Sequence, residues 1–190
     1  MKEFPRLETE RLILRPFELS DSEFVHKYVS DYDVAKMTLR IPHPYPEGLA
    51  ESWIREHCLN AEDETSHFFA IEHRESQIFT GVISIHKEAD YNSAEIGYWI
   101  GKPFWGKGYM TEAAKAVIEF GFETLKINRI YAGYFAFNPA SRRVQEKAGM
   151  TYEGTHRQAV RRGEEYIDLG MCGIIYTDYL RIKAGETPND

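Results

Sequence analysis

The amino-acid sequence predicts an α+β domain with a mixed, mostly antiparallel sheet of about seven strands and four helices. Two helical segments come first, at about residues 20–29 and 46–60, and most strand-like segments follow them. A single strand–helix–strand crossover lies around residues 95–137. Because helices and strands are largely segregated and only one crossover is present, an α+β domain with a mixed sheet is expected.

Alternation, a capping pattern and prolines mark the first elements. Residues 11–16 alternate as a strand. Ser20-Asp21-Ser22-Glu23 is typical of a capping box that opens a helix. Residues 38–46 hold three prolines and are expected to form a loop, after which Pro46-Glu47 starts the second helix.

The later elements are strands rich in β-branched and aromatic residues, with two helices between them. These strands are expected at residues 67–72, 78–85, 95–100, 129–137, 152–158 and 166–177. Apolar residues from Ala113 to Leu125 recur at helical spacing and predict a central helix. A short helix from Ala140 to Lys147 ends at Gly149, a typical C-cap, and the tail after Lys183 is expected to fray.

The composition predicts one globular domain over residues 1–190, since 43% of the residues are hydrophobic and 14% are aromatic. No apolar run approaches the ~20 residues of a membrane span, and residues 1–6 lack the apolar core of a signal peptide. The two cysteines, Cys58 and Cys172, are far apart in the sequence, which indicates a reducing compartment. A cytoplasmic location without a membrane partner is therefore expected.

The net charge of −7 argues against general nucleic-acid binding, but the charge is unevenly distributed. Residues 17–64 contain 11 acidic and 4 basic residues, whereas residues 102–149 contain 8 basic and 4 acidic residues. Solvated helix faces and a functional electrostatic field both explain this asymmetry.

The chain is organised around Trp105-Gly106-Lys107-Gly108-Tyr109-Met110-Thr111-Glu112, which lies between a predicted strand and the central helix. Glycines let the backbone approach an anion, and the first turn of a helix offers unpaired N–H groups, so phosphate binding is predicted. A structural turn capped by Thr111 is the alternative. Residues 101–107 also match the start of a nucleotide-triphosphate P-loop, but Gly108 stands where Ser or Thr should hold magnesium, so that assignment is rejected.

At these residues a family resemblance emerges. Tyr98-Trp99-Ile100, followed by Trp105-Gly106-Lys107-Gly108-Tyr109-x-Thr111-Glu112-Ala113, resembles the coenzyme A loop of GNAT-type N-acetyltransferases. The branch it resembles acetylates the N-terminal alanine or serine of ribosomal proteins. Asn138-Pro139-Ala140-Ser141 and Lys147-Ala148-Gly149-Met150 resemble the second motif of that branch. The likeness spans residues 7–180, with two departures: Met110 replaces a small residue, and Trp105 replaces Arg or Gln.

The resemblance implies a GNAT fold in which the strands before and after the central helix splay apart and the pantetheine arm lies between them. Acetyl-CoA is then the co-substrate, and no metal is expected. The coenzyme-binding residues implied are Tyr98, Trp99, Ile100, Trp105, Gly106, Lys107, Gly108, Tyr109, Met110, Thr111, Asn138, Ser141, Arg142 and Lys147. Arg142, Arg143 and Lys147 are candidates for the 3′-phosphate, or they simply coat a helix.

Acetyl transfer from a thioester to an amine needs a neutral nitrogen, donors for the oxyanion and a proton for the thiolate. By resemblance, Ser141 is the proton donor and Asn138 contacts the pantetheine arm; the alternatives are an exposed first-turn serine and a plain N-cap. Glu95 is the candidate general base, or an ordinary strand carboxylate. Some relatives carry an acid near Val160, and this chain has none there. Cys58 and Cys172 are expected in the core rather than as nucleophiles.

The sequence thus predicts direct transfer of an acetyl group from acetyl-CoA to an amine, with a protein N-terminus such as that of a ribosomal protein as the acceptor. A small amine (a polyamine or an aminoglycoside) and a non-catalytic acyl-CoA-binding module remain alternatives. Aromatic residues either line the acceptor cleft or belong to the core: these are Trp53, Tyr98, Trp99 and Tyr166. Monomer and homodimer both remain open.

Overall fold

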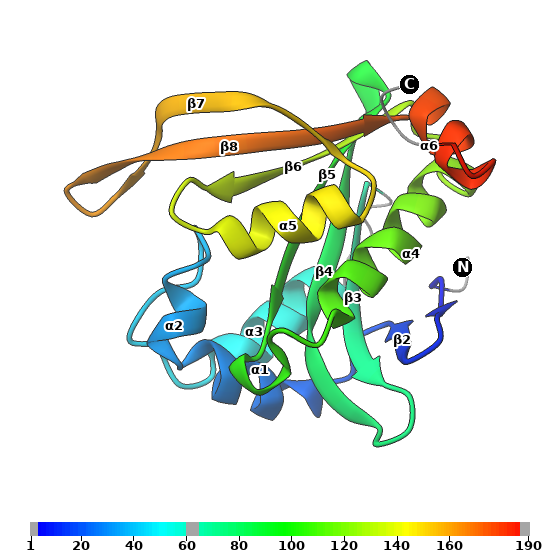
Figure 1. Ribbon diagram of the computed structural model, residues 1–190. Coiled ribbons are helices and arrows are strands. Elements are labelled where there is room, and N and C mark those ends of the chain that lie inside the picture. The colour runs from blue at the N-terminus through cyan, green and yellow to red at the C-terminus, as the bar shows by residue number, and fades with distance from the viewer. Residues whose placement is uncertain (1–3, 60–64, 187–190) are drawn as a thin grey trace.

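The computed structural model describes residues 4–59 and 65–186, which form a mixed sheet flanked by helices on both faces (Figure 1). The described residues contain eight strands in the order β1-β2-β3-β4-β5-β6-β8-β7. The strands are β1 (Leu7–Glu8), β2 (Leu12–Arg15), β3 (Ser66–His73), β4 (Ile78–Glu88), β5 (Ser93–Ile100), β6 (Arg129–Phe135), β7 (Thr151–Arg162) and β8 (Glu165–Ile175). The α-helices are α1 (Asp21–Val29), α2 (Tyr32–Ala35), α3 (Leu49–Ile54), α4 (Tyr109–Glu123), α5 (Pro139–Lys147) and α6 (Tyr176–Lys183).

The predicted α+β class and mixed sheet are confirmed, but the predicted counts of about seven strands and four helices are too low for the described residues. Strand β1 has two residues and α2 a single turn, both too short to show a period. The last predicted strand extended to residue 177, whereas β8 ends at Ile175 and α6 follows. The aromatic residues there have a strand-like composition, but Tyr179 packs its ring 5.0 Å from that of Phe122 on α4.

Hydrophobic residues form two clusters, one on each face of the sheet. Helix α4 buries residues such as Ala113 and Val117 against Ile85 of β4 and Ile130 of β6. The N-terminal helices α1 and α3 cover the other face, around Phe79 of β4. Figure 1 shows α4 and α5 on one side of the sheet and α1 to α3 on the other. No helix among residues 4–59 and 65–186 is long and apolar enough to cross a bilayer.

The two strands that flank α4 pair over a short distance only. The parallel ladder between β5 and β6 consists of Ser93 with Arg129, Ala94 with Ile130, and Glu95 with Tyr131. Beyond Glu95, β5 stays paired with β4 up to Ile100, and β6 stays paired with β8 up to Phe135. The strands therefore diverge after three residue pairs, as the predicted splay requires.

A nearly buried ion cluster joins β2, β3 and α1. The Arg15 guanidinium donates to Glu72 Oε2 at 2.7 Å and to both Asp21 carboxylate oxygens at 2.8 Å. The Arg15, Asp21 and Glu72 side chains are only 11%, 4% and 14% exposed, respectively. Each charge thus depends on its partners to offset the loss of water.

We expect Arg15→Met to lower the free energy of unfolding by about 3 kcal/mol, because it leaves two nearly buried carboxylates unpaired. Urea denaturation measures the change. Arg55→Met is the matched control: Arg55 pairs with Glu51 where both side chains are about half exposed (53% and 50%), so its loss should change stability by less than about 1 kcal/mol. Equal effects of the two variants would contradict a structural role for the Arg15 cluster.

Candidate functional site

The predicted phosphate loop connects the end of β5 to the first turn of α4. Gly106 and Gly108 have φ angles of 73° and 80°, in the left-handed region that favours glycine. Gly108 occupies the N-cap of α4, and the Glu112 N–H donates to its carbonyl at 3.1 Å. The N–H groups of Tyr109, Met110 and Thr111 therefore precede the regular hydrogen bonds of α4, at the positive end of its dipole. The cap is Gly108 and not, as the alternative predicted, Thr111.

Arg11 fastens this loop to the β1–β2 hairpin. Its Nη1 donates to the Lys107 carbonyl at 3.0 Å and its Nε to Glu112 Oε2 at 2.7 Å, while its guanidinium lies 4.8 Å from the centre of the Tyr109 ring. Burial alone would raise the pKa of Glu112, but hydrogen bonds from Thr9 and Arg11 outweigh it and lower that pKa. Sequence reasoning missed Arg11 because it lies about 100 residues before the loop.

The other predicted loop residues face in different directions. The Trp105 indole N–H donates to the Ile100 carbonyl at 2.9 Å. The Lys107 ammonium lies 5.7 Å from the centre of the Phe104 ring, and Lys107 is exposed. Met110 is only 5% exposed and packs in the α4 core, so its backbone alone is available to a ligand at the loop.

Ser141 and Tyr98, from the two predicted motifs, meet through their hydroxyl groups. Asn138 caps α5 by accepting the Ser141 N–H at 3.2 Å, with Pro139 at the first helical position. Ser141 is half-buried rather than exposed, and its Oγ lies 2.8 Å from the Tyr98 hydroxyl. Gln145, which sequence reasoning missed, places Nε2 3.2 Å from the Tyr98 oxygen. Burial raises the pKa of Tyr98 to about 12, against the effect of its bonds to Ser141 and Gln145.

Glu95 lies at the last residue pair of the β5–β6 ladder, across from Tyr131. Because side chains alternate along a strand, Glu95 and Tyr98 project to opposite faces of β5. The Glu95 side chain reaches solvent, yet partial desolvation raises the pKa of its carboxyl; Arg40 opposes this shift and Glu88 adds to it. The site therefore has a hydroxyl pair on one face of the sheet and a carboxylate on the other.

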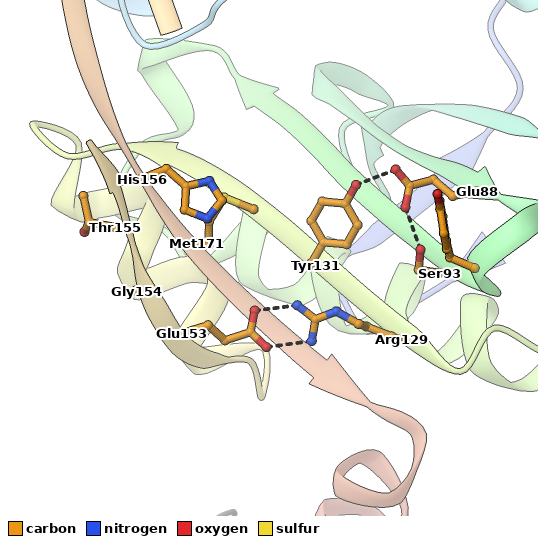
Figure 2. A pocket seen from close by; sticks show the side chains of 10 residues that line it. Glu88, Ser93, Arg129, Tyr131, Glu153, Gly154, Thr155, His156 and Met171 are labelled. Carbon is orange, nitrogen blue, oxygen red and sulfur yellow. Dashed lines mark hydrogen bonds and ion pairs between the residues drawn. The ribbon is translucent and has the colours of Figure 1, made fainter. Parts of the chain in front are cut away.

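A pocket of about 580 Å³ includes Tyr131 in its lining (Figure 2). Because Tyr131 is the strand partner of Glu95, the pocket lies on the face of the sheet to which Glu95 projects. It is lined by Glu88, Tyr91, Ser93, Arg129, Tyr131, Glu153, Gly154, Thr155, His156 and Met171. Glu88 accepts hydrogen bonds from Ser93 (2.6 Å) and Tyr131 (2.8 Å), which lower its pKa. Both donors are neutral hydroxyl groups, so they do not balance the negative charge of the Glu88 carboxylate. Arg129, by contrast, is held by Glu153 through two bonds of 2.6 and 2.5 Å.

The aromatic residues predicted for the acceptor cleft lie on both faces of the sheet, with Tyr98 in one hydrophobic cluster and Trp53 and Trp99 in the other. Trp53 packs against Phe17 and Phe68, with ring centres 5.5 and 5.4 Å apart. Trp99 lies near Phe79 in the same cluster, and Tyr166 is 60% exposed on β8. None of the three lines the pocket of about 580 Å³.

The remaining candidates are placed as follows. Cys172 is buried and Cys58 half-buried, and burial raises the pKa of Cys172 to about 11 and of Cys58 to about 12, so both stay protonated near neutral pH. Arg142 donates to Glu146 at 2.8 Å and lies over the Tyr152 ring at 4.3 Å, while Arg143 and Lys147 are exposed on α5. The described residues hold no group of three His, Cys, Asp or Glu side chains that could bind a metal.

Comparison with known proteins identifies the fold and the family. The protein-family model of the acetyltransferase (GNAT) domain matches residues 11–151 of this chain. The uncharacterised N-acetyltransferase YnaD of Bacillus subtilis is 31% identical over 172 residues, 90% of this chain and 97% of its own. The putative ribosomal N-acetyltransferase YdaF of the same species is 42% identical over 100 residues, 52% of this chain and 55% of its own.

Solved structures agree with the sequence relatives. A GNAT-family acetyltransferase from Bacillus anthracis is 32% identical, with a TM-score of 0.81 over 90% of this chain and 98% of that one. A spermidine N-acetyltransferase from Vibrio cholerae, solved with CoA and spermine, shares the fold with a TM-score of 0.76 over 90% of this chain and 99% of that one, but is only 21% identical. The chain belongs to the GNAT family of acetyl-CoA-dependent N-acetyltransferases.

Proposed function

We propose that this chain acts as one domain that transfers the acetyl group of acetyl-CoA directly to the N-terminal α-amine of a protein, such as a ribosomal protein. The observation that carries this proposal is the meeting of Ser141 with Tyr98 beside the separation of β5 and β6. Glu95 stands on the opposite face of the same strand. A donor group and an acceptor amine would thus approach from opposite faces of the sheet.

The residues around the loop fit a phosphate-bearing coenzyme. Gly106 and Gly108 are exposed, and a Cβ on Gly106 would meet nothing within 4 Å. First-turn N–H groups of α4 and the exposed Lys107 ammonium are suited to bind phosphate oxygens. Arg11 neutralises Glu112, which would otherwise repel an anion at this helix end. When bound, acetyl-CoA supplies the acetyl group as a thioester.

Ser141 and Glu95 divide the proton transfers. The Ser141 hydroxyl would donate to the leaving sulfur. Asn138 holds the backbone of Ser141 by capping α5, and it would also contact the pantetheine arm. The Glu95 carboxylate accepts the proton of the amine through water; its raised pKa makes it a better base than an ordinary glutamate. Direct transfer to the amine needs no covalent enzyme intermediate, and the two cysteine thiols, which stay protonated near neutral pH, offer no thiolate nucleophile.

An α-amine suits this site better than a lysine-like amine. Neutralising an amine of pKa ~10.4 near pH 7.4 costs about 4 kcal/mol, whereas an α-amine of pKa ~7.7–8.0 costs less than about 1 kcal/mol. Glu95 is a moderate base and Val160 offers no second acid, so the smaller cost favours the α-amine. Acidic residues in the N-terminal half, including Glu47, Glu51 and Glu56, would attract a basic peptide.

A small polyamine is the second candidate acceptor, and one specific observation favours it. Glu88 and Glu95 both lie near Tyr131. Glu88 accepts a hydrogen bond from the Tyr131 hydroxyl in the pocket, and Glu95 is the strand partner of Tyr131 at the last residue pair of the β5–β6 ladder; burial raises the pKa of Tyr131, and both carboxylates help to raise it. Glu88 lacks a cationic partner among the described residues. A second ammonium group of a polyamine would find an uncompensated carboxylate there.

For the loop, we expect Gly108→Asp to abolish coenzyme A binding measured by calorimetry, because the new charge lies at the helix end where phosphate should bind. Gly108→Asn adds similar bulk without charge and should bind more tightly than Gly108→Asp. Gly185→Asp is the matched control, at a comparable φ of 86° and far along the chain in the C-terminal segment. Unchanged affinity in folded Gly108→Asp protein would exclude this loop as the phosphate site.

For the proton donor, we expect Ser141→Ala to lower kcat by about 100-fold with little change in coenzyme affinity, as for loss of general acid assistance. Thiol release measures turnover. Ser22→Ala removes another first-turn serine, in α1, and should leave kcat unchanged. A decrease of less than about threefold in Ser141→Ala would reduce Ser141 to a helix-start residue.

For the acceptor, we expect a basic peptide with a free N-terminus to give a higher kcat/KM than spermidine, and the difference to shrink as salt rises. The same peptide with a blocked N-terminus should be inactive. Should spermidine be the better substrate, or should blocking have no effect, the polyamine assignment replaces the protein one. If the protein binds acetyl-CoA but acetylates none of these amines, the alternative of a non-catalytic acyl-CoA-binding module would replace the enzyme assignment.

A further inference from the structure

The hydroxyl groups of Tyr98 and Ser141 form a small, partly buried network with the side chain of Gln145. The two oxygens are 2.8 Å apart, and Gln145 Nε2 lies 3.2 Å from the Tyr98 oxygen and 3.4 Å from the Ser141 oxygen. Gln145 is 1% exposed and therefore cannot exchange these partners for bulk water. Three residues from β5 and α5 thus depend on one another for their hydrogen bonds.

The orientation of the Gln145 amide follows from its third neighbour. The Gly133 carbonyl oxygen lies 3.5 Å from Nε2, and a carbonyl oxygen can only accept a hydrogen bond. The NH₂ group must therefore face Gly133 and the two hydroxyls, although this leaves Oε1 buried without a protein partner among the described residues. Because an NH₂ group can only donate, the Tyr98 oxygen accepts from Gln145.

Two arrangements of the hydroxyl protons then fit the distances. In the first, the Tyr98 O–H donates to Ser141 Oγ, which leaves the Ser141 proton free for another acceptor. In the second, the Tyr98 O–H donates to the Ser141 carbonyl at 3.2 Å, and the Ser141 O–H donates to the Tyr98 oxygen. A phenol is a stronger donor than an aliphatic alcohol, and the 2.8 Å contact is the shorter one, so both considerations favour the first arrangement.

We propose that Tyr98 is a positioning residue for Ser141, in a directional chain of hydrogen bonds from Gln145 to Tyr98 to Ser141. The chain keeps the single Ser141 proton available for the leaving sulfur, and it polarises the Ser141 hydroxyl so that it donates more strongly. This inference rests on the proposed role of Ser141 in acetyl transfer. It assigns Tyr98 an action through Ser141 and gives Gln145 the task of orienting Tyr98.

The test is a double-mutant cycle on thiol release, with coenzyme affinity measured by calorimetry. Tyr98→Phe removes one hydroxyl and keeps the ring, so kcat should fall about tenfold, as for the loss of one hydrogen bond, with coenzyme affinity unchanged. Tyr98→Phe combined with Ser141→Ala should be no slower than Ser141→Ala alone, since Tyr98 acts only through Ser141. Gln145→Leu should also lower kcat, and it should have no further effect when it is combined with Ser141→Ala. This variant replaces Tyr98→Phe in the cycle if the Tyr98→Phe protein does not fold.

Tyr179→Phe is the control, because its hydroxyl bonds to Glu123 of α4, away from this network. It should leave kcat unchanged. The second proton arrangement predicts the opposite sign: Tyr98→Phe would free the Ser141 proton, and kcat would stay equal or rise. That result, or losses that add in full in the double variant, would overturn the inference while the acetyltransferase function stands. A wild-type protein without any turnover would overturn the proposed function, and this inference with it.

Discussion

The candidate site depends on the short parallel ladder between β5 and β6. Three residue pairs hold the strands together, and then each strand follows its antiparallel neighbour, β4 or β8. Antiparallel partners on both sides keep the backbone groups of the diverging strands partly paired, so the separation is tolerated inside a sheet. The packing of α4 against β4 and β5 on one face, and of α1 and α3 on the other, keeps that separation in place.

Because β5 is pleated, its candidate functional side chains project to both faces of the sheet. Tyr98 projects to the face of α4 and α5, where it meets Ser141, whereas Glu95 projects to the face with the pocket. A reaction between two substrates benefits from this arrangement because each partner can be held by its own surface, with the transfer at the strand boundary. The hydrogen-bond network of Gln145, Tyr98 and Ser141 and the carboxylate of Glu95 thus lie on opposite faces of the sheet and are connected through β5, while Glu88 belongs to the neighbouring strand β4.

The loop before α4 illustrates how remote residues prepare a binding site. Glu112 would place a negative charge in the first turn, where it stabilises the helix but repels a phosphate. Arg11 and Thr9 both donate hydrogen bonds to that carboxylate, and Arg11 also ties the Lys107 carbonyl to the β1–β2 hairpin. The helix end keeps its unpaired N–H groups for a ligand, while its own acidic residue is already neutralised.

The sequence by itself determined the α+β class, most strands, the glycine loop and the two motifs, because periodicity, turn residues and family patterns are local signals. Even the pairing of Asn138 with the Ser141 N–H is a local cap that spacing predicts. The tertiary structure alone decided what meets what: Arg11 with Glu112, Tyr98 with Ser141 and Gln145, and Glu88 with Tyr131. It also packed the partly buried Trp53 and Trp99 against the cluster on the face of α1 and α3, and it replaced the end of a predicted strand by α6. These contacts join residues tens of positions apart, and their energies arise from packing and burial, which a one-dimensional pattern does not contain.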